Sequence, residues 1–186
     1  ATAANRVATG DKYLDAGKLY VARFNADGTG DWIELAIGNA DIAAFATYAF
    51  ADQGDVLINA RLAGDAVGAT HMDRPEWCAV HPTTGEIYYS LTNNSTRKLE
   101  PAAPAVGASP DAIQRALDAA NPRSYKDAYA GGAPGSAGNI NGPIIHLKED
   151  GGLSTATGFT WDVYLFGAQS DADATTVNLS ALTADQ

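Results

Sequence analysis

The chain has 186 residues, of which 46% are hydrophobic, so it is long and apolar enough to bury a core. Its net charge of −10 and lack of a basic stripe exclude the usual nucleic-acid-binding surface, and no nucleic-acid partner is expected. No apolar run is long enough to cross a bilayer, and one cysteine excludes an internal disulfide.

The first predicted elements are two strands joined by a tight turn. Residues 17–24 and 31–35 are rich in strand-forming residues, and residues 25–30 lie between them. Asp27-Gly28 supplies the positive φ that such a turn needs. The acidic residues of this turn do not have the spacing of an EF-hand, so the sequence favours an ordinary solvated hairpin tip.

Two helices are predicted next, at Asp41–Phe50 and Asp55–Val67. Asp41 is a candidate N-cap, and the second segment has an imperfect apolar face closed by Gly68. We expect both helices to pack beside a sheet and to have a structural role.

The stretch from Thr70 to Asn94 predicts a polar loop, a strand, a tight turn and a second strand. The turn, Pro82-Thr83-Thr84-Gly85, has the length and composition of a hairpin connection. Because both ends of a hairpin lie on the same side, residues 73–76 are expected beside residues 92–94. Five polar side chains would then share one rim: Asp73, Arg74, Glu76, Asn93 and Asn94. A binding or catalytic site could be built there.

Residues 101–138 differ in character, because Pro- and Gly-rich runs flank one short apolar segment. Ser109–Leu117 has an N-cap and a proline at the first helical position, which predicts a short helix within a long excursion of the chain. Two further strands are predicted at residues 142–149 and 159–166. Strand-turn-strand units at this spacing suit propeller blades.

Two blocks of residues resemble the PhoX-type alkaline phosphatases. The first block is Gly68-Ala69-Thr70, Met72-Asp73-Arg74-Pro75-Glu76-Trp77, Val80-His81-Pro82, Thr84-Gly85, Tyr88, Leu91-Thr92-Asn93-Asn94 and Arg97. The second block is Asn121-Pro122-Arg123, Asn139, Gly142, Ile144-Ile145, Glu149 and Phe159-Thr160-Trp161-Asp162. The similarity runs from about Gly17 to the end of the chain, and two blocks in the right order make it specific.

The resemblance implies a mainly β fold that is part of a six-bladed β-propeller with helical insertions. On this interpretation residues 1–186 form a single partial propeller domain, residues 101–138 are an insertion within it, and further polypeptide completes the propeller. The resemblance also implies a phosphomonoester substrate, a cluster of calcium and ferric iron, and a secreted or periplasmic location.

Two carboxylates are predicted metal ligands because they match metal-binding Glu positions of the family. These are Glu76, which follows Pro75 at a strand entrance, and Glu149, which ends a strand. On the residues alone, Glu76 could equally pair with Arg74, and Glu149 could be an ordinary exposed acid at a strand end.

Three residues are candidates for contact with the substrate. Arg74 could hold phosphate oxygens through its planar guanidinium, or pair with a neighbouring carboxylate. Asn94 could donate to phosphate or offer its carbonyl to calcium, or cap the turn after the strand. His146 lies where many relatives have a basic residue facing the cleft, and a histidine that packs within a strand is the alternative.

The single cysteine, Cys78, is expected to be a small core residue of the predicted strand. His71 and His81 do not form a zinc-binding spacing with each other or with Cys78. The sequence therefore gives no reason to expect a zinc site.

Three functions are consistent with these residues. The first is a metal-dependent phosphomonoester hydrolase in which a metal cluster polarises the phosphate. The second is a non-catalytic, calcium-stabilised propeller with a structural or surface-assembly role. The third is a sugar hydrolase with Glu76 and Glu149 as an acid/base pair, which needs the two carboxyls about 5–10 Å apart.

Overall fold

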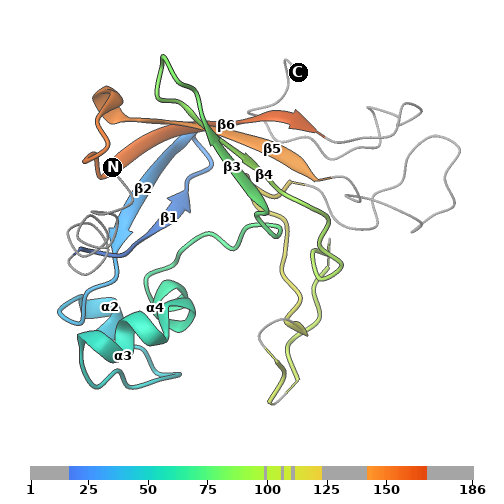
Figure 1. Ribbon diagram of the computed structural model, residues 1–186. Coiled ribbons are helices and arrows are strands. Elements are labelled where there is room, and N and C mark those ends of the chain that lie inside the picture. Colours follow the sequence, from blue (N-terminus) through green and yellow to red (C-terminus); the bar gives the residue numbers. More distant parts are fainter. Residues whose placement is uncertain (1–16, 99, 106, 110–111, 123–141, 167–186) are drawn as a thin grey trace, which may run out of the picture. The chain divides into compact units, whose positions relative to one another are not determined.

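The computed structural model describes residues 17–98, 100–105, 107–109, 112–122 and 142–166 (Figure 1). The chain divides into two compact units. The first unit contains residues 1–23 and Trp32–Ala69, and the second contains Phe24–Asp31 and residues 70–186. The assignment of residues 1–186 to one partial domain stays a prediction.

Six strands form one sheet, and every strand predicted from the sequence is present. Their order across the sheet is β1 (Tyr20–Phe24), β2 (Thr29–Glu34), β6 (Gly158–Phe166), β5 (Pro143–Glu149), β4 (Ile87–Ser90) and β3 (Trp77–Val80). The pairs β2–β6, β6–β5, β5–β4 and β4–β3 are antiparallel. The prediction of a mainly β fold is confirmed.

The two longest strands, β5 and β6, have one buried face and one polar face, as the two-residue period of a strand requires. The buried face carries Ile145, Leu147, Phe159, Trp161 and Val163, each at most 4% exposed. This face is the core of the second unit. The side chains between these residues point to the other face, which is polar and partly exposed.

Aromatic contacts fix the β1–β2 turn onto this core. The ring of Phe24 packs edge-on against those of Phe159 and Trp161, with centroids 5.2 Å apart in both cases. The indole Nε1 of Trp161 donates to the carbonyls of Asn25 and Thr29, at 3.0 and 2.8 Å. A short β-turn is therefore held by a residue more than 130 positions further along the chain.

The first unit has its own small core beside three short helices. The helices are α2 (Ala40–Ala43), α3 (Gln53–Ile58) and α4 (Ala60–Ala66), and no helix among the described residues is long and apolar enough to span a membrane. The core consists of Leu35, Ile42, Val56, Ala63 and Val67.

The two helices expected over this region are present only in part: the first ends at Ala43 and does not reach Phe50, and the second covers most of Asp55–Val67 but is divided at Asn59. Asn39, not Asp41, caps α2, and Asp52 caps α3 by accepting from the Asp55 N–H. Asn59 divides the second helix into α3 and α4, because its backbone has φ −101° and ψ 38°. Both its N–H and its side-chain amide donate to the Asp55 carbonyl, and the amide also donates to the Asp55 carboxylate.

The helix predicted at Ser109–Leu117 is also wrong within the described residues. Residues 112–122 contain no α-helix. Arg115 instead pairs in parallel with Arg97, through its N–H to the Thr96 carbonyl and its own carbonyl to the Lys98 N–H. These long-range backbone bonds replace the local bonds of a helix. The rest of the predicted insertion, residues 123–138, lies outside the described residues.

Candidate functional site

The β3–β4 hairpin brings the two polar ends of the Thr70–Asn94 stretch together, as predicted. Strand pairing sets Trp77 opposite Ser90, and the Glu76 N–H donates to the Ser90 carbonyl at 3.0 Å. Two residues further from the hairpin, the Thr92 N–H donates to the Asp73 carbonyl, also at 3.0 Å. The positive φ of Gly85, 74°, allows the tight turn at the far end of the hairpin.

Asp73 is the buried centre of this region, with 1% of its surface exposed. Its Oδ1 accepts from Asn94 Nδ2 at 2.9 Å and from Arg97 Nε at 3.0 Å, and Arg97 Nη2 lies 3.0 Å away. The Asp73 N–H donates to Asn121 Oδ1 at 2.8 Å. Burial raises the pKa of Asp73, although the Arg97 charge and the bonds from Asn94 and Arg97 act to lower it.

Arg97 is equally buried and joins three segments of the chain. Its Nη2 donates to the His71 carbonyl at 2.6 Å, and its Nη1 donates to the Ala116 carbonyl at 2.6 Å and to Asp118 at 3.2 Å. Asn121 repeats this linkage, because its Nδ2 donates to the His71 carbonyl and to Asp118. We call Asp73, Asn94, Arg97, Asp118 and Asn121 the buried polar network; Asp73, Arg97 and Asn121 are its buried members, Asn94 is half-buried, and Asp118 is exposed at its edge.

Arg74 follows Asp73 of this network in the chain and has an unusual backbone conformation. Its φ of 52° makes it the one described residue other than glycine in the left-handed region, which costs about 1–3 kcal/mol for such a residue. Its side chain is 60% exposed, and Nη2 lies 3.7 Å from Glu76 Oε1, itself on a 55% exposed side chain. An exposed ion pair of this length is weak. Both charged groups are therefore available to a ligand.

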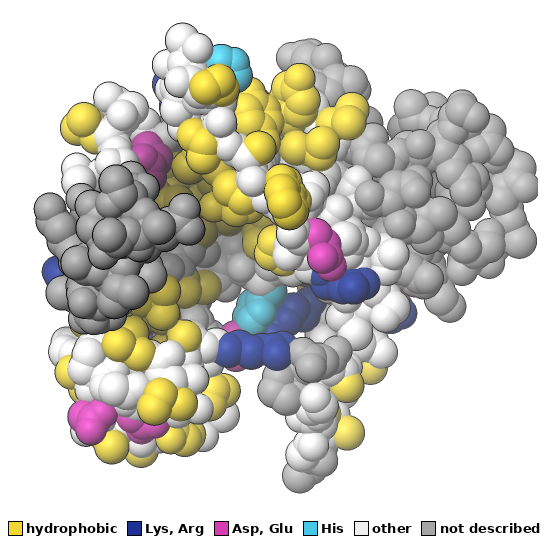
Figure 2. All heavy atoms as spheres, in the orientation of Figure 1, with side chains coloured by type: hydrophobic (Ala, Val, Ile, Leu, Met, Phe, Trp, Pro, Cys, Tyr) yellow, Lys and Arg dark blue, Asp and Glu magenta, His cyan; other side chains and the backbone are white. Residues whose placement is uncertain are grey.

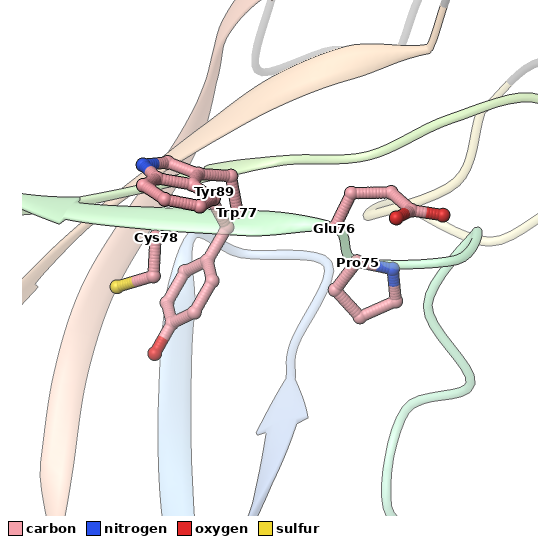
Figure 3. A pocket seen from close by; sticks show the side chains of 5 residues that line it. All are labelled: Pro75, Glu76, Trp77, Cys78 and Tyr89. Carbon is pink, nitrogen blue, oxygen red and sulfur yellow. The ribbon is translucent and has the colours of Figure 1, made fainter.

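An open pocket of about 200 Å³ lies next to Glu76 and is lined by Pro75, Glu76, Trp77, Cys78 and Tyr89. Cys78 and Tyr89 point to the same side of the β3–β4 ladder, and Trp77 points to the other (Figure 3). The expectation that Cys78 belongs to the core is wrong, because this side chain is exposed.

The exposure of Cys78 follows from the position of its strand. All four residues of β3 are exposed, since β3 is the outermost strand on its side of the sheet. Hydrophobic side chains gather over β3 and the strands beside it (Figure 2). Trp77 is 75% exposed and Val80 is 59% exposed. Among the described residues, this edge therefore presents apolar surface to solvent.

His146 lies on the polar face of β5, apart from Arg74 and Glu76. Its Nδ1 is 3.1 Å from Asp162 Oδ1, its Nε2 is 3.8 Å from Glu86 Oε2, and its ring packs 4.9 Å from that of Tyr88. Lys148 also approaches Glu86, at 3.6 Å. The hydroxyl of Thr84, the Lys148 ammonium and the nearby His146 ring lower the pKa of Glu86. These contacts match the alternative of a histidine that packs within the sheet.

Glu149 is the last residue of β5, at the end of that strand that is farther from Glu76. Ser90, which binds the Glu76 backbone, pairs with Ile144, so Glu149 is five residues further along the strand, or roughly 17 Å. This separation is too large for an acid/base pair of a sugar hydrolase. No three His, Cys, Asp or Glu side chains in the described part of the chain form a group that could hold a metal.

Of the five predicted site residues, the structure brings together Arg74, Glu76 and, through Asp73, Asn94. The amide of Asn94 already has partners, because its oxygen accepts from the N–H and hydroxyl of Thr96. The sequence interpretation missed the burial of Asp73, Arg97 and Asn121. Little in the local sequence marks these residues as buried, since most of their side-chain partners lie 19 to 50 positions away.

Comparison with known proteins places these residues in a wider context. The family described as alkaline phosphatase PhoX matches residues 2–185. The solved structure of Pseudomonas fluorescens PhoX in complex with vanadate, a transition state analogue, is similar with a TM-score of 0.53 and 33% sequence identity. The match covers 82% of this chain and 23% of that one. No curated protein matches the chain.

Proposed function

The chain belongs to the alkaline phosphatase PhoX family. From this premise we propose that it supplies a phosphate-binding arginine, Arg74, to a phosphomonoester hydrolase. The observation that carries the proposal is the conformation of Arg74. The exposed guanidinium of Arg74 belongs to a residue with a strained backbone. This residue follows the buried Asp73 in the chain, and its guanidinium lies beside the exposed carboxylate of Glu76. Strain of this kind persists where the surrounding structure enforces it, and it is concentrated at functional sites.

Arg74 suits phosphate because of its geometry and its permanent charge. A guanidinium offers two parallel N–H groups to two oxygens of one phosphate, and it stays protonated at any working pH. The Glu76 carboxylate holds this guanidinium only weakly, so an incoming phosphate can displace it. In hydrolysis Arg74 would also stabilise the negative charge that develops on the phosphoryl oxygens.

Calcium and ferric iron, which the family resemblance implies, fit the described residues only in part. Calcium takes six to eight oxygen ligands, and Glu76 offers one exposed carboxylate beside Arg74. Glu149 is roughly 17 Å further along the sheet, so it does not share a single ion with Glu76, and its role as a metal ligand stays a prediction. Because the described residues do not make a complete cluster, we assign no step of the reaction to a metal. The proposal for Glu76 is that it is one ligand of a cluster whose other ligands lie elsewhere.

Asn94 and His146 have different places in this proposal. The contacts of Asn94 support a role in holding Asp73, the residue before Arg74, in place. Those of His146 support packing against Tyr88 and Asp162. Direct contact of either residue with substrate stays a prediction.

The proposed activity belongs to more polypeptide than these residues. The chain spans 23% of the Pseudomonas fluorescens PhoX chain that it matches, and the exposed outer strand β3 is a surface on which another strand could pair. A secreted or periplasmic location is part of the proposal and is supported by the family resemblance alone. Cell fractionation with an antibody against the chain tests it.

Metal content and hydrolysis of an aryl phosphate, measured together, test the proposed function. Glu76→Gln keeps the size of the side chain and removes its charge, so both metal content and hydrolysis should fall, the latter by orders of magnitude. Glu34→Gln is the matched control, because Glu34 pairs with Lys18 at 2.8 Å and belongs to the other unit. Unchanged metal content in Glu76→Gln would contradict the ligand assignment. Calcium without hydrolysis in the unaltered protein would favour a structural propeller instead.

A further inference from the structure

The residues on both sides of Arg74 are fixed by hydrogen bonds. Before it, Asp73 uses its N–H for Asn121, its carbonyl for Thr92 and its Oδ1 for Asn94 and Arg97. After it, Pro75 has a fixed φ, and the Glu76 N–H bonds to strand β4. The backbone of Arg74 therefore has little freedom to leave its strained conformation.

Two local preferences of the backbone disfavour the left-handed conformation of Arg74. A side chain with a Cβ disfavours positive φ, and a residue before proline prefers an extended backbone. Local preference would thus return Arg74 to an extended conformation if its neighbours were released. The bonds to Asp73 oppose this change, together with the bond from the Arg74 N–H to the Met72 carbonyl and that from the Glu76 N–H to the Ser90 carbonyl.

Arg97 is the member of the buried polar network that ties the network together. One guanidinium bonds to the Asp73 carboxylate, to the His71 carbonyl and to the Ala116 carbonyl. It thereby joins the chain before Arg74 to a segment more than 40 positions further along. A lysine ammonium is a point charge and cannot span these directions at once.

Stability alone does not account for this arrangement. A buried ion pair often stabilises a protein no more than apolar side chains of the same volume would. In addition, the Asp73 Oδ2 is buried without a hydrogen-bond partner among the described residues, which is itself unfavourable. The network is better explained by the backbone geometry that it imposes on Arg74 and the residues beside it.

We propose that Arg97 is a positioning residue for the phosphate site: through Asp73 it holds Arg74 in the left-handed conformation that presents its guanidinium beside Glu76. The proposal rests on the proposed phosphate role of Arg74. It assigns Arg97 no contact with the substrate, because its side chain is 2% exposed beneath the loop.

Two measurements on Arg97→Lys test the proposal, and one of them is independent of activity. Backbone ¹⁵N relaxation should show loss of order at Arg74 and Glu76, from an order parameter of about 0.85 to below about 0.6, with the β5–β6 core unchanged. Titration with inorganic phosphate should show binding about tenfold weaker. In an Arg74→Ala background, Arg97→Lys should weaken phosphate binding no further, because the guanidinium that it positions is already gone.

Val163→Ala is the control for a general loss of stability. Val163 is fully buried in the β5–β6 core and is not a member of the network, so its truncation should lower the melting temperature and leave the order of the loop intact. If Arg97→Lys does not fold, Asn94→Ala removes one bond to Asp73 and should give a smaller change in the same two measurements.

A rigid loop in the folded variant, or an undiminished effect in the Arg74→Ala background, would overturn the positioning role. Absence of phosphate binding by the unaltered protein would instead overturn the proposed function. In that case the relaxation data still decide whether Arg97 controls the backbone of Arg74.

Discussion

The buried ion pair between Asp73 and Arg97 gives the sharpest prediction about stability. Arg97→Met keeps an unbranched, though shorter, side chain and removes every hydrogen bond that the guanidinium makes. The Asp73 carboxylate is then left 1% exposed with Asn94 as its one remaining side-chain donor among the described residues. Breaking a buried pair in this way costs about 3–5 kcal/mol, a large part of the stability of an ordinary domain.

The loss should also depend on pH in a defined direction. Burial already raises the pKa of Asp73, and removal of the Arg97 charge should raise it further. A carboxyl with a raised pKa in the folded state contributes most to stability below its unfolded pKa, near 3.9, and its contribution is lost as the pH rises through the folded pKa. The cost of Arg97→Met should therefore be greatest at neutral pH and become smaller as the solution is acidified.

Urea denaturation followed by circular dichroism measures this cost at several pH values. The double variant Arg97→Met/Asp73→Asn removes both charges, and its loss should be smaller than the sum of the two single losses by about 0.5–3 kcal/mol. A loss below about 1 kcal/mol for Arg97→Met at pH 7, or strict additivity in the double variant, would refute the reasoning.

Two further predictions concern the scaffold. Gly142 has a φ of 71°, and a Cβ there would meet the Leu91 carbonyl, so Gly142→Ala should lower the free energy of unfolding by more than about 1 kcal/mol. Gly107→Ala is its matched control, because Gly107 has a similar φ of 75° and open space around the Cβ position, and equal losses in a thermal melt would contradict the clash. The pKa of Asp55 is lowered, first by the Ala51 N–H and also by the Tyr48 hydroxyl and Asn59. Its contribution to stability is therefore present above the unfolded pKa of about 3.9 and is lost as the pH falls through the folded value, so the destabilisation by Asp55→Asn should shrink in acid. A melting-temperature difference that is constant from pH 7 to acid would count against this.

The strands could be predicted from the sequence because their signals are local. Pro82–Gly85 between two aromatic and β-branched runs defines the β3–β4 hairpin, and the alternation of Ile145, Leu147, Trp161 and Val163 defines the buried face. The hairpin also predicted correctly that residues 73–76 lie beside residues 92–94. Geometry at this range follows from the turn alone.

The errors have causes that a local pattern does not contain. The helix expected at Ser109–Leu117 is replaced around Arg115 by pairing with Thr96 and Lys98, which lie almost 20 positions earlier. Cys78 was expected in the core because it lies in a strand, but β3 is at the sheet edge, and strand order is a property of the whole sheet.

The site was predicted in its exposed parts and missed in its buried ones. Arg74 and Glu76 stand together in the sequence, and the family resemblance identifies both. Arg97 belongs to the same block of resemblance, but nothing in the sequence marks it as buried, because an arginine becomes buried only where distant segments bring it enough acceptors. Those acceptors, at His71, Asp73 and Ala116, come together only in the fold.

Binding of inorganic phosphate to Arg74→Lys, measured by calorimetry, tests the central claim most directly. Lysine keeps the positive charge and loses the two parallel N–H groups, so phosphate binding should weaken by about 1–3 kcal/mol relative to the unaltered protein. Lys148→Ala removes a cation that pairs with Glu86 on the polar face of the sheet, and it should leave phosphate affinity unchanged. Equal phosphate affinities for Arg74→Lys and the unaltered protein would contradict the claim and assign Arg74 to its pair with Glu76.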